Sequence, residues 1–380
     1  MKLVLVESPT KARTLTKFLG GDYRVEATMG HLRDLPKNKM GFLVKSENGK
    51  TKFLPEYEVA AEKKSKVADL VAAARGVDGI ILATDPDREG EAIAWHVATL
   101  LGNNKRINAS THQLFSRVVF HQITKDAILD AMKHPRELDM NLVDAQQARR
   151  ILDRMVGYQL SPLLWKKIRR GLSAGRVQSV AVRMIVERER EIEAFVPVEY
   201  WEVFVEVQDG GRFVVKLVEI DGNKADLSKK DLVDPVVADL GKAQYSVGQV
   251  DKTEVRKRPF PPFTTSTLQQ AASRTFRWSG KKTMNIAQRL YEHGFITYHR
   301  TDSTNLAKEA VENVRQLILS KYGQDYLPAE SRFFKTKNAL AQEAHEAIRP
   351  TNPEDFYNPR KLEQEVGLIA KDAFRLYQLI

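Results

Sequence analysis

The sequence predicts a multidomain α/β protein: a largely parallel sheet with helices in the N-terminal part, then helical, β-rich and again helical segments. A length of 380 residues is enough for about two to four domains, since one domain spans about 100–200 residues. Apolar runs alternate with helical patterns over residues 1–138, as they do in parallel βα units. From residue 199, apolar residues alternate with polar ones instead, which is typical of antiparallel strands.

The charge balance favours a polyanionic partner. The chain has 60 Lys and Arg against 49 Asp and Glu, which gives a net charge of +11 and a pI of about 9.5. Such a balance suits a polyanion, although many cytosolic proteins are mildly basic without one. The chain has no cysteine, which excludes disulfides and cysteine-ligated zinc. Without a signal peptide or an apolar run long enough for a bilayer, we expect a cytoplasmic protein.

Strand and helix signals alternate in the N-terminal part. Ser8 can cap a helix that has Pro9 at its first position and ends at Gly20-Gly21, and Thr124 can cap a later one. In chain order we expect strand 3–6, this first helix, a helix over 62–74, strand 79–83, a helix after Glu91, strand 118–120 and a helix over 125–132.

A carboxylate-rich loop follows strand 79–83. Asp85, Asp87 and Glu89 alternate there, with Glu91 just beyond and Gly90 allowing the turn. Open α/β sheets bind ligands at the carboxyl ends of their strands. Crowded carboxylates repel one another unless a cation joins them, and Mg²⁺ prefers oxygen ligands. The alternative is a solvated helix N-terminus, where acidic residues are favoured anyway.

The end of the first strand contributes two further candidates. Glu7 lies at the carboxyl end of strand 3–6, and Lys11 lies one helical turn later. In a parallel sheet the two strand ends are neighbours, so Glu7 would join the acidic cluster and Lys11 would face the same cleft. The alternative for Lys11 is an ordinary surface lysine.

The middle of the chain is helical from Asn141. Arg150 and Arg154 lie at i and i+4, where like charges are destabilising unless an anion or Asp153 relieves them. Ser161-Pro162 predicts the start of a separate helix. The turn 171–178 opens another helix, whose backbone amides suit a phosphate beside Arg176 and Gln178. For the arginine pair, a solvated helix face is the more common explanation, and a turn of this kind is a weak signal alone.

A second group of polar residues follows a helix that Gly294 terminates. Tyr298 and Arg300 alternate along an extended segment, so their side chains point the same way. Ser303 or Asn305 is expected to cap the next helix. A tyrosine between two helices is more often a packing residue than a catalytic one.

Taken together, these segments resemble type IA DNA topoisomerases, most closely the bacterial ones. The resemblance covers essentially the whole chain and rests on the order and spacing of seven segments: 5–12, 30–36, 85–91, 172–179, 262–268, 296–303 and 345–350. It implies a Toprim domain at 1–36 and 60–138, the first part of a helical gate domain at 37–59 and 139–195, the first part of a β-rich arch at 196–258, and a tyrosine-bearing domain at 259–380.

The resemblance also implies roles for individual residues. Tyr298 would be the nucleophile that forms a 5′-phosphotyrosine link with single-stranded DNA, assisted by Glu7, Lys11 and Arg300. Glu7 would protonate the departing 3′ oxygen. The magnesium-binding set would be Glu7, Asp85, Asp87 and Glu89. The residues contacting DNA would be His31, Arg88, Arg150, Arg154, Ser173, Arg176, Gln178, Asp302, His345 and Arg349.

Two features depart from the family pattern. Gln122 occupies a position where relatives often carry Glu. The sequence stops at Ile380 inside a helical pattern with no terminating residue, so we expect an N-terminal fragment with impaired relaxation of supercoils.

We expect a monomer, associated with the nucleoid, that relaxes negatively supercoiled DNA without a nucleotide, because the chain has no Gly-x-x-x-x-Gly-Lys-Ser/Thr phosphate loop. Two other functions remain open. A Toprim nuclease or primase would use the same carboxylates without Tyr298. A catalytically silent fragment would bind single-stranded DNA without forming a covalent adduct.

Overall fold

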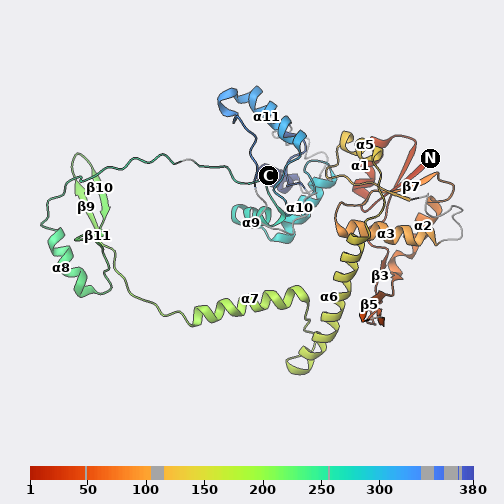
Figure 1. Ribbon diagram of the computed structural model, residues 1–380, viewed down its shortest axis with the longest axis horizontal. Coiled ribbons are helices and arrows are strands. Elements are labelled where there is room, and N and C mark those ends of the chain that lie inside the picture. Colours follow the sequence, from red (N-terminus) through yellow and green to blue (C-terminus); the bar gives the residue numbers. More distant parts are fainter. Residues whose placement is uncertain (48, 104–114, 256, 335–345, 355–366, 368–369) are drawn as a thin grey trace. The chain divides into compact units, whose positions relative to one another are not determined.

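The computed structural model describes residues 1–47, 49–103, 115–255, 257–334, 346–354, 367 and 370–380 (Figure 1). The chain forms two compact units, Met1–Ala174 with Phe260–Ile380 and Gly175–Pro259. Across the described residues, no helix combines the length and the apolar character that crossing a membrane requires.

A four-stranded parallel sheet organises the first unit, which confirms the predicted fold class. Its spatial order is β2 (Tyr23–Ala27), β1 (Lys2–Val6), β7 (Gly79–Leu82) and β8 (Phe115–Arg117). Leu5 of β1 pairs with Leu82 of β7, so the residues that follow these strands emerge at one edge.

The prediction of a strand over residues 118–120 is wrong. Residues 118–120 follow β8 instead of forming the strand, and only the Val118 amide continues the ladder, to the Leu82 carbonyl at 3.0 Å. Val118 and Phe120 are apolar because they are buried in the core, which the hydrophobic pattern alone does not distinguish from strand pairing.

Helices cover both faces of the sheet. Val4 and Val6 pack into one core with α1 (Pro9–Leu19) and α5 (Lys125–Lys133). The alternate residues Leu3 and Leu5 pack into a second core with α2 (Lys64–Ala73) and α3 (Arg88–Gly102). Figure 1 shows these two pairs of helices on either side of the sheet. The period-2 alternation of a strand thus separates two hydrophobic layers.

The C-terminal helices share the first of these cores. They are α9 (Thr265–Phe276), α10 (Gly280–Glu292) and α13 (Ala370–Leu379). Leu268, Leu290 and Leu376 are fully buried in the cluster that contains Val6 and Ile123. This packing brings the extended segment after α10 to the edge of the sheet.

The helix after this segment begins later than expected. It is α11 (Lys308–Tyr322), whose cap residue Ala307 makes no side-chain bond. The predicted caps Ser303 and Asn305 are wrong, because the Ser303 hydroxyl instead accepts from the Asn305 amide at 3.1 Å in a local turn.

The long helix α6 (Met140–Lys167) also differs from expectation. It runs through Pro162 without a break, so the separate helix expected from Ser161-Pro162 is wrong. Ser161 does not cap a new helix, because its hydroxyl accepts from the Ala174 amide at 3.1 Å. Proline keeps a helical φ and removes only its own donor, so a helix can continue through it at some cost.

The remaining elements are short paired strands, helices and 3₁₀ turns. In the first unit they are β3 (Arg33–Asp34) with β6 (Glu58–Val59), β4 (Phe42–Glu47) with β5 (Lys50–Pro55), and the 3₁₀ turns Ala61–Lys63 and Gln324–Tyr326. The second unit contains α7 (Arg176–Glu193), β9 (Phe204–Gln208) with β10 (Arg212–Lys216), β11 (Glu219–Ile220) with β12 (Asn223–Lys224), and α8 (Lys230–Leu240). Helix α8 lies within the stretch that the sequence predicts to be β-rich.

Gly294 provides a test of the contact between the tyrosine-bearing segment and the sheet domain. Its φ is +80°, and a Cβ would lie 2.3 Å from the Ile123 carbonyl oxygen. Gly323 has a φ of +90°, but a Cβ there would meet no described atom within 4 Å. We expect Gly294→Ala to reduce the free energy of unfolding by about 1–3 kcal/mol more than Gly323→Ala, because only the first adds overpacking to backbone strain. Urea denaturation measures both, and equal losses would contradict the close contact.

Candidate active site

The carboxylate loop between β7 and α3 is tightly wound. Asp87 caps α3, with its Oδ1 accepting from the Gly90 amide at 2.8 Å. The Thr84 hydroxyl donates to the Gly90 carbonyl at 2.7 Å. A Cβ on Gly90 would lie 2.2 Å from the Asp85 carbonyl oxygen, so only glycine allows this approach. The loop therefore has a defined shape that fixes the direction of each carboxylate.

Lys11 lies at the centre of the carboxylates beneath this loop. Its side chain is 1% exposed, and its Nζ contacts Asp85 Oδ1 and lies 3.4 Å from Glu7 Oε2. Glu7 Oε1 also accepts from the Asp85 amide at 3.2 Å. The structure thus brings Glu7, Lys11 and Asp85 together, but Lys11 is buried among the carboxylates and is neither an ordinary surface lysine nor open to a cleft.

The buried charges shift one another's protonation. Burial raises the pKa of Glu7 to about 8, although the Lys11 ammonium opposes this shift. Burial acts in the same direction on Asp85, but Lys11 and the hydrogen bond with Glu7 outweigh it and lower the pKa of Asp85 to about 2. Burial lowers the pKa of Lys11, yet the two carboxylates leave it raised. The favoured state is therefore a protonated Glu7 beside a Lys11–Asp85 ion pair.

Tyr298, from the extended segment after α10, contacts the acidic loop. It is 3% exposed, and its hydroxyl donates to Asp87 Oδ2 at 2.6 Å. Its amide donates to the His121 carbonyl at 2.8 Å, which holds the segment against the sheet domain. Burial, followed by the charges of Asp85 and Asp87, raises the pKa of Tyr298 far above its usual value. The hydroxyl is thus neutral and needs a proton acceptor before it can attack anything.

Arg300 adds a positive charge beside Tyr298. Its Nη1 lies 3.7 Å from Asp87 Oδ2, and its side chain is about half exposed. Lys11 is held inside the protein, whereas Arg300 can reach a ligand from solvent.

A buried arginine that the sequence analysis missed holds the loop backbone. Arg117 is 0% exposed and donates to four carbonyls, those of Leu82, Thr84, Asp85 and Val118, at 2.7–3.0 Å. It also donates to Glu91 Oε2 at 2.9 Å, which Arg136 contacts as well. The sequence offered only a weak signal, an arginine immediately before the apolar run 118–120.

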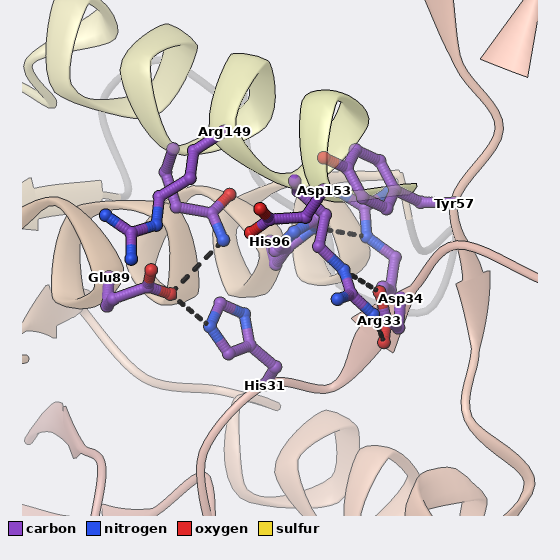
Figure 2. A pocket seen from close by; sticks show the side chains of 10 residues that line it. His31, Arg33, Asp34, Tyr57, Glu89, His96, Arg149 and Asp153 are labelled. Atoms are coloured by element: carbon purple, nitrogen blue, oxygen red, sulfur yellow. Dashed lines mark hydrogen bonds and ion pairs between the residues drawn. The ribbon is translucent and has the colours of Figure 1, made fainter. Parts of the chain in front are cut away.

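A polar cavity of about 310 Å³ lies next to the acidic loop, between α3 and α6. Figure 2 shows Glu89 and His31 on one side of it and Asp34 and Tyr57 on the other. Glu89 Oε2 is bonded to His31 Nε2 at 3.1 Å and to Gln146 Nε2 at 3.2 Å. These bonds hold Glu89 toward the cavity.

Arginines of α6 line this side of the domain. Arg150 makes a two-pronged ion pair with Asp34, at 2.9 and 2.5 Å. Arg154 donates to the carbonyls of Leu35, Pro36 and Lys39. Of the residues expected to bind DNA, the structure thus places His31 and Arg150 in the cavity that Glu89 lines, with Arg154 one helical turn further along α6.

The other expected DNA contacts are spread over the chain. Arg88 is exposed at the first position of α3, and Asp302 is exposed after the tyrosine segment. Arg349 is bonded to Glu346 and, at 3.2 Å, to Gln122 Oε1, so the family departure at 122 provides a neutral partner. Ser173 belongs to the first unit, while Arg176 and Gln178 belong to the second. His345 lies outside the described residues.

The expected metal centre is not assembled as one group. Among the described residues, no three His, Cys, Asp or Glu side chains lie close enough to hold a metal ion. Asp85 and Asp87 face Lys11 and Tyr298, whereas Glu89 faces His31. Mg²⁺ commonly takes only one or two carboxylates, with phosphates and water completing its shell. The oxygen donors of this loop fit an ion held in that way, and the four-carboxylate set stays a prediction.

Comparisons with known proteins agree on one family. Residues 2–123 match the Toprim domain, and residues 137–380 match the DNA topoisomerase family. DNA topoisomerase 1 of Campylobacter jejuni is 46% identical over 100% of this chain and 53% of its own length; that of Rickettsia felis is 45% identical over 100% and 49%. Full-length topoisomerase I from Thermotoga maritima has a similar structure, with a TM-score of 0.75 and 38% identity over 99% of this chain and 59% of its own. The chain spans about half the length of the curated relatives it matches.

Arg117 makes the scaffold of the site testable. We expect Arg117→Met to reduce the free energy of unfolding by about 3–5 kcal/mol, because it leaves buried carbonyls and Glu91 short of a partner. The control is Arg183→Met, which removes an exposed i,i+4 pair with Glu187 and should cost less than about 0.5 kcal/mol. Urea denaturation at neutral pH compares the two, and a similar small loss in both variants would show that Arg117 does not hold the loop.

Proposed function

Because the chain belongs to the type IA DNA topoisomerase family, we propose that it cuts one DNA strand transiently with Tyr298 and rejoins it. The observation that carries this proposal is the 2.6 Å hydrogen bond from Tyr298 to Asp87, which joins residues 211 positions apart in the sequence. A buried tyrosine that served only for packing would not need to donate to a carboxylate of the ligand-binding edge of the sheet.

The proposed cleavage balances without an outside reagent. The Tyr298 oxygen attacks a backbone phosphorus, the bond from phosphorus to the 3′ oxygen breaks, and a 5′-phosphotyrosine link forms. The tyrosine proton passes to Asp87, and the Glu7 carboxyl gives a proton to the departing 3′ oxygen. Rejoining reverses each transfer. The link conserves the energy of the phosphodiester bond, so no nucleotide is consumed.

Positive charge is needed where the phosphate reacts. Lys11 and Arg300 are the cations beside Asp85 and Asp87 in the described site, and they would stabilise the phosphoryl group. A magnesium ion held by Asp85 and Asp87, with Glu7 or Glu89 as a further ligand, would add charge neutralisation during rejoining.

The proposed substrate is a single-stranded region of negatively supercoiled DNA. The α6 arginines and His31 would hold the strand that leads to Tyr298, with Arg88, Ser173, Arg176, Gln178, Asp302, His345 and Arg349 as further contacts. Passage of a second strand through the break would then relax supercoils.

The nucleophile is tested by Tyr298→Phe, which removes only the hydroxyl. We expect the covalent adduct with labelled single-stranded DNA to disappear on a denaturing gel, while affinity stays within about threefold because phosphate contacts dominate it. Tyr322→Phe, at a 59% exposed position, is the control and should form the adduct normally. Adduct formed by the Tyr298 variant would refute the assignment. Cleavage without any adduct in the unmodified chain would indicate a nuclease, and binding without cleavage a silent binding protein.

The metal role is tested by replacing Asp85 with Asn, which keeps its size and leaves Asp87 to accept the Tyr298 proton during cleavage. We expect Mg²⁺ no longer to accelerate the rejoining of preformed adduct, since the ion loses a charged ligand. Asp139→Asn, at the cap of α6, is the control and should rejoin DNA with Mg²⁺ as before. Rejoining by the unmodified chain that is unaffected by EDTA would count against a metal.

A further inference from the structure

Tyr291 is a second tyrosine of the site, and it has no role in the proposed chemistry. We propose that it is a positioning residue: its hydroxyl takes the place of the Lys11 ammonium at Asp85 when Lys11 turns to the phosphate of bound DNA. The inference rests on the proposed cleavage by Tyr298 and concerns how the site releases its buried cation.

The first observation is an unsatisfied hydroxyl. Tyr291, near the end of α10, is 0% exposed, and its Oη has no hydrogen-bond partner among the described residues. A buried donor without a partner is destabilising, so its presence calls for an explanation. Phenylalanine would fill the same space without that cost.

The second observation is the position of the ring. Its centroid lies 5.1 Å from that of Tyr298 and 5.2 Å from the Lys11 Nζ. Burial raises the pKa of Tyr291, and the charges of Asp85 and Glu7 and the nearby Asp85 acceptor raise it further, although no hydrogen bond to Asp85 is completed. Tyr291 therefore contacts both the nucleophile and the cation, and it presents a donor on the side of Asp85.

The third observation is that Lys11 is not free to act. Its side chain is 1% exposed, and its ammonium is held between Asp85 and Glu7. To stabilise a phosphate it must loosen its contact with Asp85. A buried carboxylate left without its partner is strongly unfavourable, so this step needs another donor at Asp85. The Tyr291 hydroxyl, which makes no other bond among the described residues, can supply it.

The replacement Tyr291→Phe removes the hydroxyl and keeps the ring over Lys11. Adduct formation is measured in single turnover over a range of concentrations of labelled single-stranded DNA. We expect the limiting rate to fall about tenfold, which corresponds to about 1.4 kcal/mol, with an unchanged half-saturating concentration. The melting temperature should stay the same or rise, because an unsatisfied polar group is removed. Tyr326→Phe, at a 72% exposed position, is the matched control and should change neither the rate nor the melting temperature.

The outcomes separate this inference from the proposed function. An unchanged limiting rate in Tyr291→Phe, with normal adduct in the unmodified chain, overturns only the role of Tyr291. A rate that falls together with the melting temperature shows a structural role instead and also overturns it. Absence of adduct in the unmodified chain overturns the proposed function and this inference together.

Discussion

Compensation of buried charge at one edge of the sheet is the constraint on which the rest of the site depends. Glu7, Lys11 and Asp85 come from two neighbouring parallel strands and the helix between them, and all lie beneath the tyrosine-bearing segment. Burying any one of these charged groups alone would carry a prohibitive desolvation free energy. Together, the three groups form a protonated carboxyl beside an ion pair. The sheet register fixes their spacing, and the arginine beneath the loop fixes the backbone that carries Asp85.

The same balance of buried charges explains how the Tyr298 side chain can be buried. Its hydroxyl needs a buried acceptor, which the Asp87 carboxylate provides beside Arg300. Because Tyr298 is 3% exposed, its hydroxyl cannot meet a phosphate in this arrangement, so the proposed cleavage requires the tyrosine segment to part from the loop. The links that must yield include the Tyr298 hydroxyl bond, its amide bond to His121 and the Gln122–Arg349 contact, together with part of the apolar packing between the C-terminal helices and the sheet.

The sequence was informative where a residue's role follows from local pattern. Apolar runs located β1 and β7, and Ser8, Pro9 and Gly20 marked both ends of α1. It was misleading where burial imitates a strand, as at Val118, and where a proline lies in a helix that continues, as at Pro162.

Glu89 shows why the site was harder to predict than the fold. Asp85, Asp87 and Glu89 alternate in sequence, but α3 already begins at Arg88, so helical rotation turns Glu89 toward His31 and Gln146. Arg117 escaped notice because its partners are backbone carbonyls, which leave no pattern in a sequence. Contacts of this kind depend on the tertiary structure, and only the coordinates reveal them.

Under the proposed function, the contrast between the two sets of cations predicts an order of events. Arg150 and its partner Asp34 are 40% and 48% exposed, so exchanging that carboxylate for a DNA phosphate costs little. Lys11 and Asp85 are 1% and 14% exposed, so separating them is expensive. A strand would therefore engage the exposed arginines first and gain the binding energy that later opens the buried pair. Affinity would then depend mainly on α6, and the rate of cleavage mainly on the cluster at the edge of the sheet.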